Sequence, residues 1–276
     1  MSRNGKPKLG QNFLVDPRAA ERIVAALGDI SNILVMEIGP GKGALTDVLA
    51  ARAGHLIAIE LDRMLATELR FKHARNPKVE ILEGDVLRID FRTVLDRSVG
   101  PLHDLRRERP SRARVVGNLP YYITSDILLR LFAFQEQFEV IVIMVQREVA
   151  ERIAARPGTR DYGLLSATAQ LYARVERLFT LPPGAFSPPP KVHSSVLRLA
   201  LAPRFQELQI QPKEFIQFLK HAFAMKRKTL LNNLKKIYPE QHIRSALAEV
   251  GLSNDVRAEA LPLEKSAAVF RRLSQG

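Results

Sequence analysis

The stretch Ile33-Leu34-Val35-Met36-Glu37-Ile38, followed directly by Gly39-Pro40-Gly41-Lys42-Gly43, decides the fold of this chain. Its first six residues are apolar except for Glu37, and they predict a buried strand. The residues after the glycines carry leucine and valine at helical spacing. A strand, a glycine loop and a helix in this order form the unit that binds phosphates or nucleosides in an open α/β sheet, because glycines let the backbone come close to a ligand.

The spacing of the glycines narrows the class of ligand. It reads G-x-G-x-G, whereas dinucleotide-binding loops read G-x-G-x-x-G, and Gly43 follows Lys42 where a P-loop needs serine or threonine. A glycine loop alone is weak evidence, since some such loops are structural turns. A second predicted strand, 55–59, ends in Glu60, which lies 21 residues after Gly39. A carboxylate there can accept hydrogen bonds from both hydroxyls of a ribose, the alternative being a solvated strand-end glutamate.

Further apolar runs continue the alternation of strands and helices. They predict strands at 79–82, 115–117, 139–146, 174–180 and 194–201, which brings the total to seven. Helices separate the first five strands, and the last two form a terminal pair. The predicted fold class is therefore α/β, with a seven-stranded, mostly parallel sheet and a final antiparallel strand. Asp85 follows the third strand, where it either accepts a hydrogen bond from an adenine amine or caps the next turn.

A break at 203–212 divides the chain into two predicted domains, a ligand-binding domain over 1–202 and a small helical domain over 203–276. From residue 204 onward there are 13 Lys and Arg against 7 Asp and Glu, and Lys226-Arg227-Lys228 form one basic cluster. Arginines also crowd the irregular stretch 97–114. That stretch either contacts RNA or forms a solvated insert.

The whole chain is basic, with 42 Lys and Arg against 29 Asp and Glu and a net charge of +13. Such a surplus indicates a polyanionic partner, RNA or DNA before an anionic membrane surface, although a merely basic soluble enzyme is the alternative. There is no cysteine, and the six histidines are scattered, so we expect no metal site. The sequence has no apolar run long enough to span a membrane and no secretory leader, which predicts a cytoplasmic protein.

The segment Asn118-Leu119-Pro120-Tyr121 follows a predicted buried strand. A side-chain amide, a rigid turn and an aromatic ring at a strand end can hold a flat ring that carries an exocyclic amine. Phe186 lies in a proline-dense loop, 182–192, which loses little entropy when it presents a side chain. Taken singly, Tyr121 and Phe186 are equally well explained as packing residues.

Together these segments resemble one family. The chain looks like the ribosomal RNA adenine dimethyltransferases of the KsgA type over nearly its whole length. The residues that carry the resemblance are Gln11-Asn12-Phe13-Leu14, the segment 37–43, Glu60, Asp85, the segment 118–121 and Phe186-x-Pro188-x-Pro190-Lys191-Val192. The resemblance implies a Rossmann-like class I methyltransferase fold, S-adenosylmethionine (SAM) as cofactor, and two adjacent adenosines in the 3′-terminal hairpin loop of small-subunit rRNA as target. It also implies a monomer whose partner is the small ribosomal subunit, with a role in subunit maturation.

The resemblance assigns cofactor roles to six residues. Asn12 and Leu14 would close over SAM, Gly39 would approach its methionine part, Glu60 would bind the ribose hydroxyls, Asp85 the adenine amine, and Asn118 would bridge donor and substrate.

The family also implies how the target amine is held. The Asn118 side-chain oxygen and the Leu119 carbonyl would accept its two N–H bonds, Pro120 would fix the turn, and Tyr121 and Phe186 would stack on the base. Tyr122 departs from the family, which often has Asn at this position, and this puts the fine substrate geometry in doubt.

Three other functions share some of these features. A large-subunit rRNA methyltransferase of the macrolide-resistance type has nearly the same motifs. An RNA-binding assembly factor would use catalysis only secondarily. A NAD-dependent oxidoreductase needs a glycine spacing that this chain lacks, and it leaves 118–121 unexplained.

Overall fold

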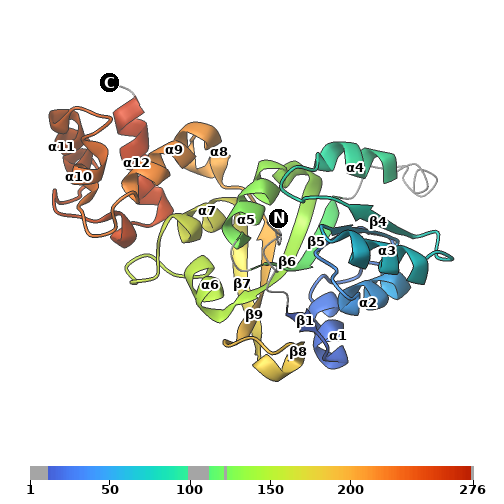
Figure 1. The fold of residues 1–276 in the computed structure, drawn as a ribbon. Coiled ribbons are helices and arrows are strands. Elements are labelled where there is room, and N and C mark those ends of the chain that lie inside the picture. Colours follow the sequence, from blue (N-terminus) through green and yellow to red (C-terminus); the bar gives the residue numbers. More distant parts are fainter. Residues whose placement is uncertain (1–11, 99–111, 121–122, 275–276) are drawn as a thin grey trace, which may run out of the picture. The chain divides into compact units, whose positions relative to one another are not determined.

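The computed structural model describes residues 12–98, 112–120 and 123–274 (Figure 1). The chain divides into two compact units, the first made of residues 1–147 and 177–199 and the second of 148–176 and 200–276. Residues 148–176 thus group with the C-terminal helices, a grouping that the sequence did not predict. The proposed domain boundary at 202/203 stays a prediction.

A seven-stranded sheet has the order β4-β3-β2-β5-β6-β9-β7. The strands are β2 (Leu34–Ile38), β3 (His55–Glu60), β4 (Val79–Glu83), β5 (Ala113–Asn118), β6 (Phe138–Gln146), β7 (Ala173–Leu181) and β9 (Ser194–Leu201). The pairs β2–β3, β3–β4, β2–β5 and β5–β6 are parallel. The predicted seven-stranded, mostly parallel sheet is confirmed.

The order of the strands fixes where a ligand can bind. From β2 the chain builds outward through β3 and β4, and it then returns to place β5 on the other side of β2. The strand order therefore reverses between β2 and β5. Ligands of open α/β sheets bind outside the carboxyl ends of the strands at such a reversal.

Helices α1 (Pro17–Ala25) and α2 (Ala44–Arg52) lie beside each other in the first unit (Figure 1). The sequence Asp16-Pro17 predicts a helix start, because Asp is a common N-cap and Pro suits the first helical position. The structure confirms it: the side chain of Asp16 accepts hydrogen bonds from the backbone N–H groups of Arg18 (2.9 Å) and Ala19 (3.1 Å). Ile23 and Leu49, one from each helix, are buried in one cluster with Val35 of β2. The unit also contains α3 (Arg63–Lys72), α4 (Phe91–Ser98), α5 (Thr124–Ala133) and a 3₁₀ turn (Gln135–Gln137).

A small second sheet was not predicted. Strand β1 (Phe13–Leu14) pairs antiparallel with β8 (Phe186–Ser187), and β8 follows a 3₁₀ turn (Pro183–Ala185). Phe13 lies opposite Ser187, and Leu14 lies opposite Phe186. The backbone N–H of Val15 donates to the carbonyl of Ala185 at 2.9 Å. The N-terminal segment is thereby joined to the proline-dense loop.

The second unit is helical. It contains α7 (Leu164–Tyr172), α8 (Phe205–Leu208), α9 (Pro212–Ala222), α10 (Leu230–Leu234), α11 (Glu240–Glu249), a 3₁₀ turn (Ala258–Ala260) and α12 (Leu263–Ser274), and α6 (Arg147–Ile153) leads into it. The rings of Phe215, Phe218 and Phe270 meet with centroids 5.3–5.9 Å apart. Among the residues that the structure describes, no helix is both long and apolar enough to cross a membrane.

The sequence predicts a helix over 227–237, but the basic cluster 226–228 lies in a turn and the helix is shorter. It begins at Leu230 because the hydroxyl of Thr229 accepts a hydrogen bond from the backbone of Asn232 at 3.2 Å. The buried side chain of Asn233 donates to the carbonyls of Ala222 (2.7 Å) and Met225 (3.2 Å). Side-chain hydrogen bonds to the backbone therefore hold the chain on both sides of the basic residues.

Candidate active site

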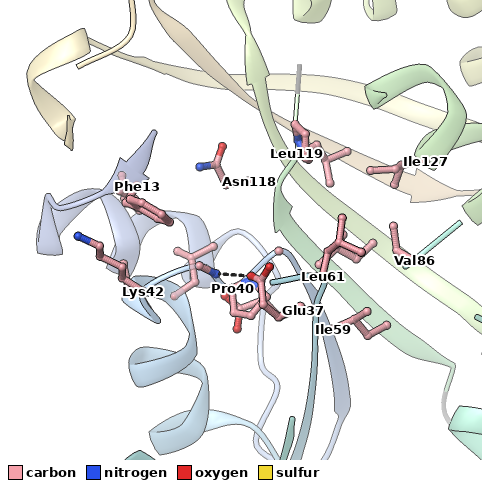
Figure 2. A pocket seen from close by; sticks show the side chains of 18 of the residues that line it. Phe13, Glu37, Pro40, Lys42, Ile59, Leu61, Val86, Asn118, Leu119 and Ile127 are labelled. Carbon is pink, nitrogen blue, oxygen red and sulfur yellow. Dashed lines mark hydrogen bonds between the residues drawn. The ribbon is translucent and has the colours of Figure 1, made fainter. Parts of the chain in front are cut away.

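A cavity lies at the carboxyl ends of β2, β3 and β5, where the strand order reverses (Figure 2). Eight of the ten residues that the sequence singled out line it: Asn12, Leu14, Gly39, Glu60, Asp85, Asn118, Leu119 and Pro120. Most of its remaining wall is apolar and includes Ile38, Leu61 and Val86. A mostly apolar cavity with a few polar groups is the usual form of a site for a small organic ligand.

Glu60 ties the glycine loop to the end of β3. The residue is 2% exposed. One carboxylate oxygen accepts a hydrogen bond from the backbone N–H of Gly41 and the other from that of Asp62, each at 2.9 Å. Gly41 has a φ of +58°, in the left-handed region that favours glycine. Each carboxylate oxygen keeps a second lone pair, so Glu60 can still accept hydrogen bonds from a ligand's hydroxyl groups.

Glu37 is a buried carboxyl to which the sequence assigned no role. It is 1% exposed, it lines the cavity, and its Oε2 accepts a hydrogen bond from the hydroxyl of Thr46 at 2.7 Å. Burial raises the pKa of Glu37 to about 8, an effect that the Thr46 hydrogen bond opposes and the negative charges of Glu60 and Asp47 reinforce. The signal was a lone carboxyl inside an apolar strand, two residues before the first glycine of the loop.

Asp85 serves the turn after β4 as well as the cavity wall. Its Oδ1 accepts a hydrogen bond from the backbone N–H of Leu87 at 2.9 Å, and the residue lines the cavity. The turn-capping role that the sequence left open is therefore present. Capping occupies one lone pair only, so the carboxylate remains able to accept a hydrogen bond from an amine.

Asn118 ends β5 with its side-chain amide at the cavity. The amide nitrogen donates to the backbone carbonyl of Asn12 at 3.1 Å. The backbone N–H of Leu119 donates to the carbonyl of Met144 at 3.1 Å, and the hydroxyl of Thr124 donates to the carbonyl of Pro120 at 3.0 Å. The turn is thus fixed from the sheet on one side and from α5 on the other.

The two predicted stacking residues are not among those placed at the cavity wall. Tyr121 lies outside the described residues, as do Tyr122 and Gln11. Phe186 is 3% exposed and belongs to a buried cluster that includes Leu14 and Ala185. The structure therefore shows the packing role for Phe186, and its role in stacking on a base stays a prediction.

Comparisons with known proteins show the family of this chain. Residues 2–275 match the family described as Ribosomal RNA adenine dimethylase. The chain is 56% identical to "Ribosomal RNA small subunit methyltransferase A" of Koribacter versatilis (strain Ellin345), over 99% of this chain and 98% of the relative. It is 54% identical to the protein of the same name from Acidobacterium capsulatum, over 97% of this chain and 91% of the relative.

Solved structures support the fold. A dimethyladenosine transferase from Plasmodium falciparum matches with a TM-score of 0.78 at 23% identity, over 95% of this chain and 98% of that one. The 23S rRNA methyltransferase ErmE matches with a TM-score of 0.68 at 25% identity, over 96% of this chain and 100% of that one. The fold is that of a Rossmann-like class I methyltransferase, a family of enzymes that use SAM. With a family match over nearly its whole length and relatives of high identity, the chain belongs to the ribosomal RNA adenine dimethylase family.

Proposed function

We propose that this protein transfers methyl groups from SAM to the N6 atoms of two adjacent adenosines in the 3′-terminal hairpin loop of small-subunit rRNA. One observation carries the proposal: the amide of Asn118 opens onto the same cavity as Glu60 and the glycine loop. The carboxylate of Glu60 would then bind the donor nucleoside in the same cavity in which Asn118 binds the exocyclic amine of the substrate. The name shared by the two relatives above points to the small subunit.

The chemistry of the cavity wall suits SAM. Glu60 would bind the ribose hydroxyls, Asp85 the adenine amine, and Gly39 would lie along the methionine part. The apolar wall next to them matches the faces of an adenine ring. Asn12, just before β1, and Leu14, in β1, both line the cavity and would cover the bound molecule. When bound, SAM supplies a methyl group that its sulfonium already makes electrophilic.

The protein's part in the transfer is to orient the amine. The lone pair of an adenine N6 is delocalised into the ring, so this nitrogen is a poor nucleophile. The Asn118 oxygen and the Leu119 carbonyl accept its two N–H bonds and direct the lone pair toward the methyl group, while Pro120 keeps the two acceptors in place. Positioning and electrostatics then supply most of the catalysis, and the proton leaves to water after transfer.

The RNA must offer an unpaired adenosine, because a base inside a stacked helix cannot reach the cavity. Tyr121 and Phe186 would stack on its faces, each for about 1–3 kcal/mol. Phe186 would leave its buried cluster for this contact. The net charge of +13 and the exposed turn 226–228 favour a phosphate backbone as partner. The protein would act as a cytoplasmic monomer on the small ribosomal subunit and contribute to its maturation.

A methyl-transfer assay tests the proposal. Purified protein is given labelled SAM with undermethylated small subunits and, in parallel, with large subunits, and the RNA is then analysed as nucleosides. N6,N6-dimethyladenosine from the small subunit is the expected product. Label on the large subunit alone would indicate a 23S rRNA methyltransferase, the activity for which ErmE is named. If neither RNA is methylated while SAM still binds, the protein is a binding factor or acts on a different RNA, and the proposed reaction is wrong.

A further inference from the structure

Phe13, which belongs to none of the roles assigned above, contacts the glycine loop from the N-terminal strand. A Cβ atom at Gly41 would lie 2.8 Å from Cδ1 and 3.0 Å from Cε1 of its ring, so the ring lies directly on the loop. The ammonium of Lys42 is 4.9 Å from the centre of the ring, within the range of a cation–π interaction. Figure 2 shows Phe13 above Lys42, on the side of the cavity toward Asn118. Phe13, Gly41, Lys42 and Asn118 all line the cavity.

The residue before Phe13 holds the amide of Asn118. Its backbone carbonyl, that of Asn12, accepts the hydrogen bond from Nδ2 of Asn118 at 3.1 Å. If the amide were flipped, two oxygens would face each other at this distance, so the bond assigns nitrogen to the side of Asn12. The amide oxygen is then the end that is left for a substrate amine.

Strand pairing fixes the sides to which the side chains of β1 point. Phe13 lies opposite Ser187 and Leu14 opposite Phe186, and neighbouring side chains of a strand point to opposite sides. Phe13 therefore faces the glycine loop, while the side chain of Leu14 joins the buried cluster that contains Phe186. Two contacts therefore fix the position of the Asn12 carbonyl: the contact of the Phe13 ring with Gly41 and the pairing of β1 with β8.

We infer that Phe13 is a positioning residue for methyl transfer: its ring, seated on Gly41, holds the Asn12 carbonyl against Asn118, so that the amide presents its oxygen to the amine of the substrate. The inference rests on the proposed role of Asn118. Without the ring, the carbonyl loses its support and the amide rotates between two orientations, only one of which accepts the N–H bond.

A double-mutant cycle tests the inference with the full-length protein. Single-turnover methyl transfer to small subunits is measured at saturating SAM for wild type, Phe13→Ala, Asn118→Ala and the double variant. We expect Phe13→Ala to lower the rate about tenfold, the effect of roughly one lost interaction. In the Asn118→Ala background, Phe13→Ala is expected to lower the rate less than about twofold, because the effects of two substitutions that act through one contact are not additive.

Three further variants separate positioning from folding and from cofactor binding. Phe13→Tyr keeps the ring and is expected to transfer at nearly the wild-type rate. Val15→Ala, which removes an exposed side chain from the same segment, is the matched control. If Phe13→Ala does not fold, Phe13→Leu takes its place in the cycle. Calorimetry is expected to show SAM affinity within about threefold of wild type, less than the change in rate.

The outcomes are distinguishable. Equal fold-losses for the Phe13 change with and without Asn118 would overturn the inference and leave the proposed function intact. The same holds if the loss of rate follows SAM affinity alone. Full activity of Asn118→Ala, or an inactive wild type, would instead overturn the proposed reaction together with this inference.

Discussion

Replacement of Glu37 by glutamine tests the electrostatics of a buried carboxyl that lines the cavity. Glutamine has the shape of a protonated glutamic acid and can still accept the hydrogen bond from Thr46. In the fold the pKa of Glu37 is about 8, against an ordinary value of 4.5. Between these pH values the folded protein keeps a proton that the unfolded chain has lost. Stability therefore falls as pH rises from about 4.5 to about 8.

The size of the effect follows from the shift. Each pH unit in this window costs about 1.4 kcal/mol, so the unfolding free energy of Glu37→Gln relative to wild type should rise by up to roughly 5 kcal/mol between pH 4.5 and pH 8. Urea unfolding at several pH values, followed by far-ultraviolet circular dichroism because the chain has no tryptophan, measures it. Glu68→Gln, on an exposed position of α3, is the control. If the difference in unfolding free energy between Glu37→Gln and wild type is the same at pH 5 and pH 8, then Glu37 ionises as readily in the fold as in the unfolded chain. The reasoning would then be wrong.

Three other substitutions test the site and the basic turn. Glu60→Ala should weaken SAM binding by about 10- to 100-fold in calorimetry, since hydrogen bonds to a carboxylate contribute about 1.5–3 kcal/mol. Its RNA affinity should stay unchanged, and the control Glu83→Ala, at an exposed position, should bind SAM as the wild type does. Unaltered SAM affinity of Glu60→Ala would contradict the ribose assignment. Reversal of Lys226, Arg227 and Lys228 to glutamate should weaken binding to small subunits and reduce its salt dependence, and an unaltered salt slope would move the RNA surface elsewhere. Gly41→Ala should lower the unfolding free energy by at least about 1–2 kcal/mol, the cost of a side chain at left-handed φ, and thermal unfolding at the wild-type midpoint would refute it.

Elements with local signals could be predicted from the sequence. The start of α1 depends on the neighbouring Asp16 and Pro17, and the strand β2 and its glycine loop form one continuous segment. Glu60 could be placed because the lengths of a glycine loop, a helix and a strand fix its distance from Gly39 along the chain. The roles of the cavity residues remain proposals, although the structure brings eight of the ten together.

Features that depend on distant partners could not be predicted. Strands β1 and β8 have two residues each and lie more than 170 positions apart, so neither has a periodic pattern that could be recognised. The hydrogen bond from Asn118 to the Asn12 carbonyl involves the backbone, which leaves no trace in the residue types. The start of α10 was within reach, because Thr229 is a good N-cap, but the apolar spacing alone extended the helix too far.

The interleaving of the two units has a consequence for folding during synthesis. The 29 residues from 148 to 176 leave the ribosome before the first unit is complete, since that unit ends at Leu199. Their partners come later: Tyr172 packs edge-on against Phe205 with ring centres 5.1 Å apart, and Gly158 donates to the carbonyl of Glu259 at 2.8 Å. At about 5–20 residues per second, synthesis of the last 77 residues takes roughly 4–15 s. For that interval the nascent chain carries apolar surface that residues 200–276 cover once the second unit has folded.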